Sequence, residues 1–338
     1  MSLQSRPILG RAVRASGCLL SSSRPLATSI HIASASQCLP PFGYRPPRSS
    51  PVASNSTIQT PLPRDNSPQK TQRFREFDLD GKVFVVTGGG RGLGLAMAEA
   101  LVEAGGQVHC IDRANDPDQD FVEAQKRANP EFGGSLHYHR MDVRDRESVE
   151  STMKEIALKK NRLDGLIAAA GVNRVGDAME CTEKDIDDLM TINYHGVFFT
   201  ATAAAKQMRE MKSNGSILLV ASISGLVANK GMTSAIYNSS KASVIQLTRN
   251  LAMEWGKDKS GCGNVRVNCL CPGHISTPMV EKVLQETPDS AKIWEEANML
   301  GRLARPEEFR GAALFLLSPA SSYMTGSALV MDGGHTAW

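Results

Sequence analysis

The sequence lacks any apolar run near the roughly 20 residues that a helix needs to cross a bilayer, which excludes an integral membrane protein. It also lacks a disulfide framework, because its seven cysteines are odd in number and irregularly spaced. Cys269 and Cys271 are separated by one residue, which is too close for a zinc knuckle. His137 and His139 alternate along a predicted strand and are too few for a metal site. The pattern therefore indicates buried reduced thiols and no metal.

Aspartate, glutamate and lysine are absent from residues 1–64, which contain seven arginines and carry a charge of +7. The rest of the chain has 31 basic and 35 acidic side chains, a charge of −4. The folded part thus lacks the basic field that would hold a polyanion. We therefore expect no nucleic acid and no membrane among its partners.

Residues 1–34 are basic, rich in serine and free of acidic side chains, which is the composition of a mitochondrial transit peptide. Residues 24–29 also resemble the two-step mitochondrial processing pattern Arg-x-Leu-x-x-Ser. We expect delivery to the mitochondrial matrix. The alternative is a disordered tail on a cytoplasmic protein. Residues 35–75 are polar and rich in proline, so they predict a disordered linker.

Residues 76–338 alternate strand patterns with helix patterns, and the strands are almost continuously apolar. This alternation predicts one α/β domain of the doubly wound type, a parallel sheet covered by helices on both faces. Such sheets bind ligands beyond the carboxyl ends of their strands. The predicted strands are residues 83–87, 107–112, 136–142, 163–170, 216–222, 265–270 and 328–331, with the first helix ending near Ala104.

A glycine-rich run, Thr-Gly-Gly-Gly-Arg-Gly-Leu-Gly, occupies residues 87–94 between the first strand and the first helix. Glycine there permits a tight turn and a close approach to a pyrophosphate, which the helix N-terminus attracts. The run therefore predicts a dinucleotide site. Its predicted cofactor-binding residues are Thr87, Gly88, Arg91, Gly92, Leu93 and Gly94.

The second strand is predicted to end in Asp112, 18 residues after Gly94. A carboxylate at this position accepts both ribose hydroxyls of adenosine and repels a 2′-phosphate. This favours NAD over NADP. Arg91 and Arg113 are each placed to contact a 2′-phosphate, which leaves NADP open. Both arginines are also interpretable as solvated surface charges.

Asp142 is predicted to end the third strand, where its carboxylate accepts a hydrogen bond from the adenine amino group. The backbone amide of Val143 would assist. The alternative is that Asp142 is the N-cap of the following helix.

Tyr237 and Lys241 are four residues apart in a helical stretch, so they share one helix face. A tyrosine pKa near 10 is too high for a base at neutral pH, and a nearby ammonium lowers it. The pair can then move a proton to or from a carbinol oxygen while a hydride passes to or from a nicotinamide ring. A helix surface is the alternative interpretation of the pair.

Two further polar residues complete a candidate catalytic set. Ser222 is predicted to end the fifth strand and to hold the substrate oxygen beside the tyrosine, with Ser224 as a local competitor. Asn193 lies in the middle of a predicted helix, where asparagine is not favoured. Its side chain is predicted to bind a water that extends a proton relay from Lys241. The alternative is a polar residue that bends the helix.

In this order, the glycine-rich run, Asp142, the four catalytic candidates and the turn Pro272-Gly273 resemble the classical short-chain dehydrogenase/reductases. The resemblance covers residues 76–338. It implies a seven-stranded Rossmann sheet and a homo-oligomer (dimer or tetramer). Cofactor contacts are implied at Asn193, Tyr237, Lys241, Pro272 and Gly273, and contacts with the nicotinamide carboxamide at Ile275 and Thr277. It also implies that Tyr237 is the acid/base, Lys241 lowers its pKa and binds the nicotinamide ribose, Ser222 positions the substrate, and Asn193 holds the relay water.

One departure from the family pattern concerns the segment after the fourth strand. The family usually has Asn-Asn-Ala-Gly there, whereas this chain has Ala168-Ala169-Ala170-Gly171. The missing amides put the local hydrogen bonding in doubt. Close passage of the backbone over the cofactor still needs the small Ala170 and Gly171.

Several segments around the predicted site are similar to fungal polyol dehydrogenases of the arabinitol and mannitol type. They are residues 222–225, Asn229, residues 237–241 and residues 251–255. The sequence thus predicts an NAD(P)-dependent oxidoreductase that interconverts a secondary alcohol and a ketone, such as arabinitol and ribulose. Two alternatives stay open: a ketoreductase for acyl or polyketide-like substrates, which would use Arg302 and Arg305 to bind a carrier, and a non-catalytic scaffold subunit of a mitochondrial assembly.

We also expect the segment from Ser276 to about Arg305 to cover the substrate. Its apolar residues Met279, Trp294 and Met299 suit a lid, and ordinary helix packing is the alternative. Asn173, Arg174 and His274 are further candidates for the wall of the pocket.

Overall fold

The computed structural model describes residues 74–128, 133–257, 261, 263–286 and 289–338. The chain divides between Ser67 and Pro68 into two units, and every described residue belongs to the second unit. The predicted transit segment and nearly all of the predicted linker lie outside the described residues, so both stay predictions.

Seven parallel strands form one sheet in the order β3-β2-β1-β4-β5-β6-β7, which confirms the predicted doubly wound α/β fold. The order reverses direction between β1 and β4, and such a switch point opens a crevice at the carboxyl edge. The strands are β1 (Val83–Thr87), β2 (Gln107–Asp112), β3 (Ser135–Arg140), β4 (Gly165–Ala168), β5 (Gly215–Val220), β6 (Val265–Pro272) and β7 (Ala328–Met331).

The predicted ends of three strands were wrong in a consistent way. Strands β3, β4 and β5 stop two residues before the predicted ends, where the paired residues of their ladders end. Asp142 and Ser222 therefore lie in turns beyond the sheet rather than in strands. Strand β6 is longer than predicted, because its last residues pair with β7 through Pro272 and Met331.

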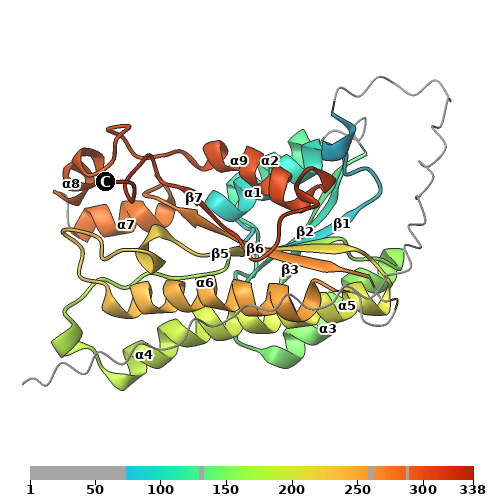
Figure 1. Ribbon diagram of the computed structural model, residues 1–338, viewed down its shortest axis with the longest axis horizontal. Helices are drawn as coiled ribbons and strands as arrows, with labels where there is room; N and C mark the ends of the chain where they lie inside the picture. The colour runs from blue at the N-terminus through green and yellow to red at the C-terminus, as the bar shows by residue number, and fades with distance from the viewer. Residues whose placement is uncertain (1–73, 129–132, 258–260, 262, 287–288) are drawn as a thin grey trace, which may run out of the picture. The chain divides into compact units, whose positions relative to one another are not determined.

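Helices cover both faces of the sheet (Figure 1) because alternate residues of each strand point to opposite faces. In β1, Val83 and Val85 pack in the core with α3, α5 and α6, whereas Phe84 and Val86 pack in the core with α1, α2 and α9. The helices are α1 (Gly92–Glu103), α2 (Gln119–Arg127), α3 (Arg146–Lys160), α5 (Val197–Glu210), α6 (Ala235–Trp255) and α9 (Arg310–Leu317).

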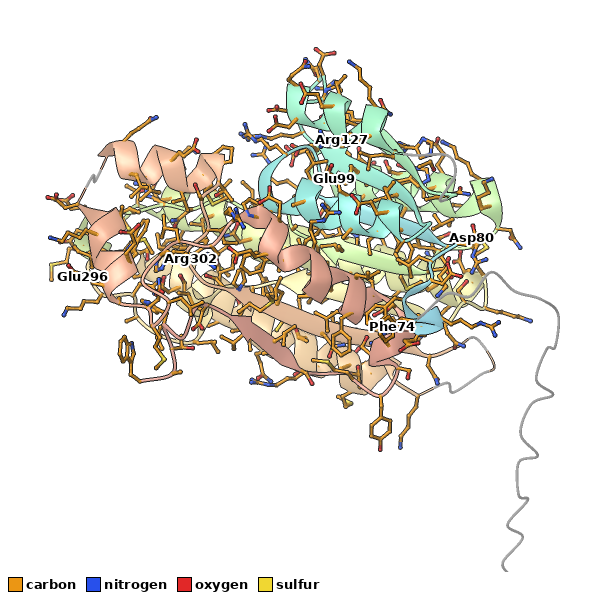
Figure 2. All side chains as sticks on the ribbon, turned by 90° about the horizontal axis from the view of Figure 1, so that it is seen from above. Phe74, Asp80, Glu99, Arg127, Glu296 and Arg302 are labelled. Carbon is orange, nitrogen blue, oxygen red and sulfur yellow. The ribbon has the colours of Figure 1, made fainter. Side chains whose placement is uncertain are left out.

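Polar contacts at the surface join and cap these helices. Glu99 of α1 and Arg127 of α2 lie side by side in Figure 2 and form an ion pair of 2.7 Å. Asp118 caps α2 and Asp145 caps α3 through backbone N–H groups of the first turn.

Within the described residues no helix is long and apolar enough to span a membrane.

Three short helices, α4 (Glu183–Met190), α7 (Pro278–Glu286) and α8 (Ser290–Glu296), lie at one end of the domain (Figure 1). A π-helical turn, Thr191–Gly196, joins α4 to α5 and contains Asn193. Such turns insert one extra residue into a helix and are frequent at functional sites. Short 3₁₀ helices among the described residues lie at Arg75–Phe77, Ala178–Glu180, Ile223–Gly225, Pro306–Phe309 and Pro319–Ser321.

Candidate active site

The glycine-rich turn between β1 and α1 leaves no room for side chains. A Cβ on Gly94 would lie 2.1 Å from the carbonyl oxygen of Gly88, and a Cβ on Gly88 would lie 2.8 Å from the backbone of Ala170. Gly88 and Gly92 also have positive φ angles of 66° and 56°, which favour glycine. The turn thus exposes backbone N–H groups at the start of α1, and this cradle fits the pyrophosphate of a dinucleotide.

A cavity of about 950 Å³ opens beside this turn, at the carboxyl edge of the sheet. It brings together residues at or after the carboxyl ends of six strands, β1 to β6, as the switch-point rule predicts. Seventeen of the predicted cofactor-binding residues line it. They are Gly88, Arg91, Gly92, Leu93, Gly94, Asp112, Arg113, Asp142, Val143, Ala170, Gly171, Tyr237, Lys241, Pro272, Gly273, Ile275 and Thr277.

Thr87 lies behind the cavity wall rather than in it. Its carbonyl oxygen accepts a hydrogen bond from Ala169 N (3.1 Å), and its hydroxyl accepts one from Ala170 N (3.4 Å). These bonds tie β1 to the loop after β4. The loop therefore keeps its place without the asparagine amides that the family pattern has there.

Asn193 also lies behind the wall, and its side chain bonds to protein groups. Its Oδ1 accepts from Val172 N (2.9 Å), and its Nδ2 donates to Val172 O (2.9 Å) and to Ser240 Oγ (3.1 Å). Both amide hydrogens are thus donated to protein groups. These bonds give Asn193 a positioning role, because they fix the loop after β4 against α6. The water-holding role stays a prediction.

Asp112 lies at the end of β2 and faces the glycine-rich turn. Its Oδ2 accepts from Gly90 N (3.3 Å) and its Oδ1 from Arg113 N (2.8 Å). A carboxylate has about four lone-pair sites, so two backbone bonds leave capacity for ribose hydroxyls. Arg91 and Arg113 line the same cavity as this carboxylate.

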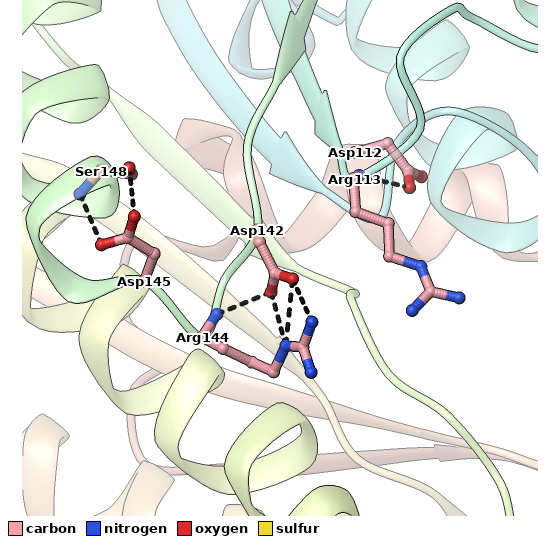
Figure 3. Close-up of polar contacts among 6 residues, drawn as sticks. All are labelled: Asp112, Arg113, Asp142, Arg144, Asp145 and Ser148. Carbon is pink, nitrogen blue, oxygen red and sulfur yellow. Dashed lines mark hydrogen bonds and ion pairs between the residues drawn. The ribbon is translucent and has the colours of Figure 1, made fainter.

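Asp142 is held by its neighbour Arg144, which the sequence analysis did not single out. Figure 3 shows the guanidinium across both carboxylate oxygens, with Nη2 2.6 Å from Oδ2 and the backbone N 3.0 Å from Oδ1. Arg144 keeps the pKa of Asp142 below its usual range. The N-cap of α3 is Asp145, so the capping role considered for Asp142 is excluded. A basic residue two positions after the aspartate was the available signal.

Ser222, Tyr237 and Lys241 meet at the opposite end of the cavity from Asp112 and Asp142, which lie beyond β2 and β3. Ser222 is the N-cap of the turn Ile223–Gly225, and its Oγ accepts from Ser224 N (3.1 Å). The buried Lys241 Nζ donates to Val220 O (2.9 Å) and lies 5.7 Å from the ring centre of Tyr237. The serine, the phenol and the ammonium thus share one wall. The competitor Ser224 does not line the cavity and instead accepts a bond from Asn229.

Burial shifts the pKa values of this pair in opposite directions. Burial lowers the pKa of Lys241 to about 8, because the ammonium loses water. Burial raises the pKa of Tyr237, and the Ser222 hydroxyl opposes that rise. Loss of water around the phenolate thus acts against the lowering of the Tyr237 pKa that is expected from Lys241, and that lowering stays a prediction.

The substrate end of the cavity includes α7 and the loop after β4. Met279, Val280 and Val283 of α7 line it, and so do Asn173 and Arg174. Trp294 and Met299, predicted for the lid, do not line it. His274 does not line it either, because its ring stacks on Trp294 with centres 4.4 Å apart. Val280 and Val283 were missed because they belong to an ordinary apolar helix pattern.

No metal cluster of three or more histidine, cysteine or acidic residues occurs within the described part of the chain. His137 and His139 lie beside His109, whose Nδ1 is 2.8 Å from His139 Nε2. This group lies on the edge of the sheet, away from the cavity lining.

Comparisons with known proteins agree with this geometry. Residues 88–336 match a family model described as Enoyl-(Acyl carrier protein) reductase. The chain is 37% identical to the short chain dehydrogenase/reductase notP′ of Aspergillus versicolor, over 85% of this chain and all of that protein. This chain belongs to the short-chain dehydrogenase/reductase family. It is an oxidoreductase, and the family uses NAD or NADP.

Two further relatives bear on the chemistry. The chain is 36% identical to D-arabinitol 2-dehydrogenase (ribulose-forming) of Candida tropicalis, over 78% of this chain and 95% of that protein. It is 31% identical to NADPH-dependent 3-quinuclidinone reductase of Rhodotorula rubra, a crystal structure that it matches with a TM-score of 0.69 over 82% of this chain and all of that one. The predicted resemblance to fungal polyol dehydrogenases is thus confirmed.

Proposed function

We propose that this protein oxidises a secondary hydroxyl of a polyol to a ketose, and reduces the ketose in reverse, with NAD. The observation that carries the proposal is the meeting of Ser222, Tyr237 and Lys241 at one end of a cavity whose other end fits a dinucleotide. The 36% identity to an arabinitol dehydrogenase supports a polyol as substrate.

The proposed chemistry assigns one step to each residue. The bound nicotinamide cofactor supplies the hydride acceptor. Ser222 Oγ holds the substrate hydroxyl, and Tyr237 Oη removes its proton as the carbonyl forms. Lys241 donates a hydrogen bond to Val220 O, which holds its Nζ near the phenol. When Lys241 is protonated, its positive charge favours the phenolate form of Tyr237. Asn193 positions the loop after β4, so that Gly171 passes close to Lys241.

Gly171 lies close to both Asn193 and Lys241. A Cβ there would lie 3.3 Å from Asn193 Oδ1 and 3.5 Å from Lys241 Nζ. Ile275 and Thr277, which also line the cavity, would hold the carboxamide of the nicotinamide. Thr277 stands at the start of α7, where its Oγ1 also accepts from Val280 N (3.4 Å).

The preference for NAD is part of the proposal and depends on Asp112. Its carboxylate lines the cavity next to the glycine-rich turn, where it would accept the ribose hydroxyls and repel a 2′-phosphate. Arg91 and Arg113 beside it favour NADP, and one structural relative is NADPH-dependent. Asp112 lies at the carboxyl end of β2, where the adenosine ribose would bind, and this position is the reason to give it the greater weight.

A second candidate is a ketoreductase for acyl substrates, which the apolar side chains of α7 and the description of the family model favour. Recognition of a carrier protein through Arg302 and Arg305 finds less support. Arg302 forms a bidentate ion pair with Glu308 (2.7 and 2.8 Å), and neither arginine lines the cavity.

We further propose a homo-oligomer and mitochondrial delivery through residues 1–34.

Steady-state oxidation tests the proposed substrate class. The full chain is assayed with arabinitol and other five- and six-carbon polyols, and separately with the acyl substrate acetoacetyl-CoA in the reducing direction. We expect polyol oxidation with NAD and little acetoacetyl-CoA reduction. Efficient thioester reduction without polyol activity would replace the proposal with the second candidate. Absence of all redox activity would favour the non-catalytic scaffold.

A further inference from the structure

We propose that Arg174 and Asp185 form a subsite for two neighbouring hydroxyl groups of the substrate, next to the hydroxyl that is oxidised. The inference rests on the proposed function and deepens it. It identifies the residues that distinguish a polyhydroxylated substrate from a simple alcohol or an acyl chain.

The two side chains form a built pair in the cavity wall. Arg174 belongs to the loop after β4 and Asp185 to the first turn of α4, and both line the cavity. Arg174 Nη1 lies 2.5 Å from Asp185 Oδ1. Asp185 Oδ2 is held from the other side by Thr182 N (3.0 Å) and Thr182 Oγ1 (2.8 Å). The carboxylate is therefore fixed, and it fixes the guanidinium.

A backbone hydrogen bond places this pair at the substrate end. Gly176 N donates to Thr233 O (2.8 Å), which joins the loop after β4 to the segment before α6. Thr233 precedes Tyr237 by four residues. Arg174 is two residues from this junction. The adenosine end, with Asp112 and Asp142, follows β2 and β3 on the other side of the sheet centre.

The chemistry of the pair matches a diol. A guanidinium has five N–H donors and no acceptor, whereas a carboxylate only accepts. One substrate hydroxyl can accept from Arg174 while its neighbour donates to Asp185, and both bonds are charge-assisted. An apolar chain offers neither group. A bound apolar chain would remove water from the ion pair and supply no hydrogen bond in its place, which is unfavourable in free energy.

A neighbouring amide supports the same interpretation. Asn173 also lines the cavity, and its buried Oδ1 has no hydrogen-bond partner among the described residues. A buried acceptor without a donor is unfavourable in free energy. A hydroxylated substrate in this wall would supply a donor.

The test compares two substrates in one set of variants. Wild type, Arg174→Gln and Arg174→Lys are assayed for kcat and KM on arabinitol and on 2-butanol, which lacks further hydroxyls. We expect Arg174→Gln to lower kcat/KM on arabinitol by about tenfold or more, mainly through KM, as loss of a charge-assisted hydrogen bond requires. Activity on 2-butanol should change by less than about twofold, and Arg174→Lys should recover part of the loss.

Arg302→Gln is the matched control, because it removes an arginine–carboxylate pair that lies outside the cavity lining (Figure 2 labels Arg302). It should leave both substrates unchanged. Equal loss on arabinitol and 2-butanol in Arg174→Gln, or no loss on either, overturns the subsite while polyol oxidation itself stands. A wild type that oxidises 2-butanol and no polyol overturns the proposed substrate class and the subsite with it, before any variant is made.

Discussion

Asp112 is the residue on which the choice of cofactor depends. Its carboxylate lines the cavity and also contacts the glycine-rich turn. The hydrogen bond that Gly90 N donates to Oδ2 orients the carboxylate. A Cβ on Gly90 would lie 2.9 Å from that oxygen, so a larger residue there would displace the carboxylate. A single side chain thus links the shape of the turn to the charge that a bound adenosine meets.

Replacing Asp112 by alanine should therefore change selectivity rather than abolish binding. We expect Asp112→Ala to weaken NADH binding by about tenfold, because hydrogen bonds to a charged acceptor are lost. NADPH binding should strengthen, since Arg91 and Arg113 are no longer opposed by the carboxylate. Fluorescence titration with each reduced cofactor measures both effects. Arg113→Gln is the control and should weaken NADPH alone, whereas an unchanged NADH affinity in Asp112→Ala would reject the NAD preference.

At the scale of elements, the edge formed by β2, β3 and α3 contains an unusual histidine group. His109 of β2 is almost fully buried, with His137 stacked on its ring at 4.8 Å and His139 at hydrogen-bond distance. Burial is the main cause that lowers the pKa of His109 to about 3, and positive charge on His137, His139 and Lys159 adds to it. Glu155 of α3 acts against this effect at His139. The folded state therefore favours the neutral form of the His109 imidazole.

This group makes folding stability dependent on pH with a definite sign. Between the unfolded pKa near 6.5 and the folded pKa of about 3, the unfolded chain binds a proton that the folded chain does not. Stability should therefore fall as pH decreases through this range. Urea unfolding at pH 7.5 and pH 5.0 measures the loss, which His109→Gln should reduce. A variant that loses as much stability as the wild type would show that the acid sensitivity comes from other groups.

The elements also show what the sequence can and cannot predict. Strands β1, β2 and β7 matched their predicted bounds, because apolar runs flanked by glycine or polar residues leave little choice. The ends of β3, β4 and β5 were wrong, since an apolar residue beyond the ladder looks the same in sequence as one within it. The π-helical turn at Asn193 was not foreseen, because only the bonds to Val172 and Ser240 explain why the helix widens there.

At the scale of the whole described domain, the cavity depends on residues that come together only in three dimensions. Motif spacing located seventeen of nineteen predicted cofactor residues on its wall. It could not locate Arg144 or the valines of α7, whose roles depend on which helix face or turn meets the cavity. Thr87 and Asn193 lie one layer behind. They belong to the framework that ties the loop after β4 to β1 and α6.

The central claim is that this cavity performs hydride transfer with Tyr237 as the acid/base. The direct measurement compares Tyr237→Phe with wild type in polyol turnover and in NADH fluorescence titration. We predict that turnover falls by at least about a hundredfold, because general acid–base catalysis is lost. NADH affinity should stay within about twofold, since the ring and the bond between Lys241 and Val220 are kept. Normal turnover in Tyr237→Phe would contradict the account.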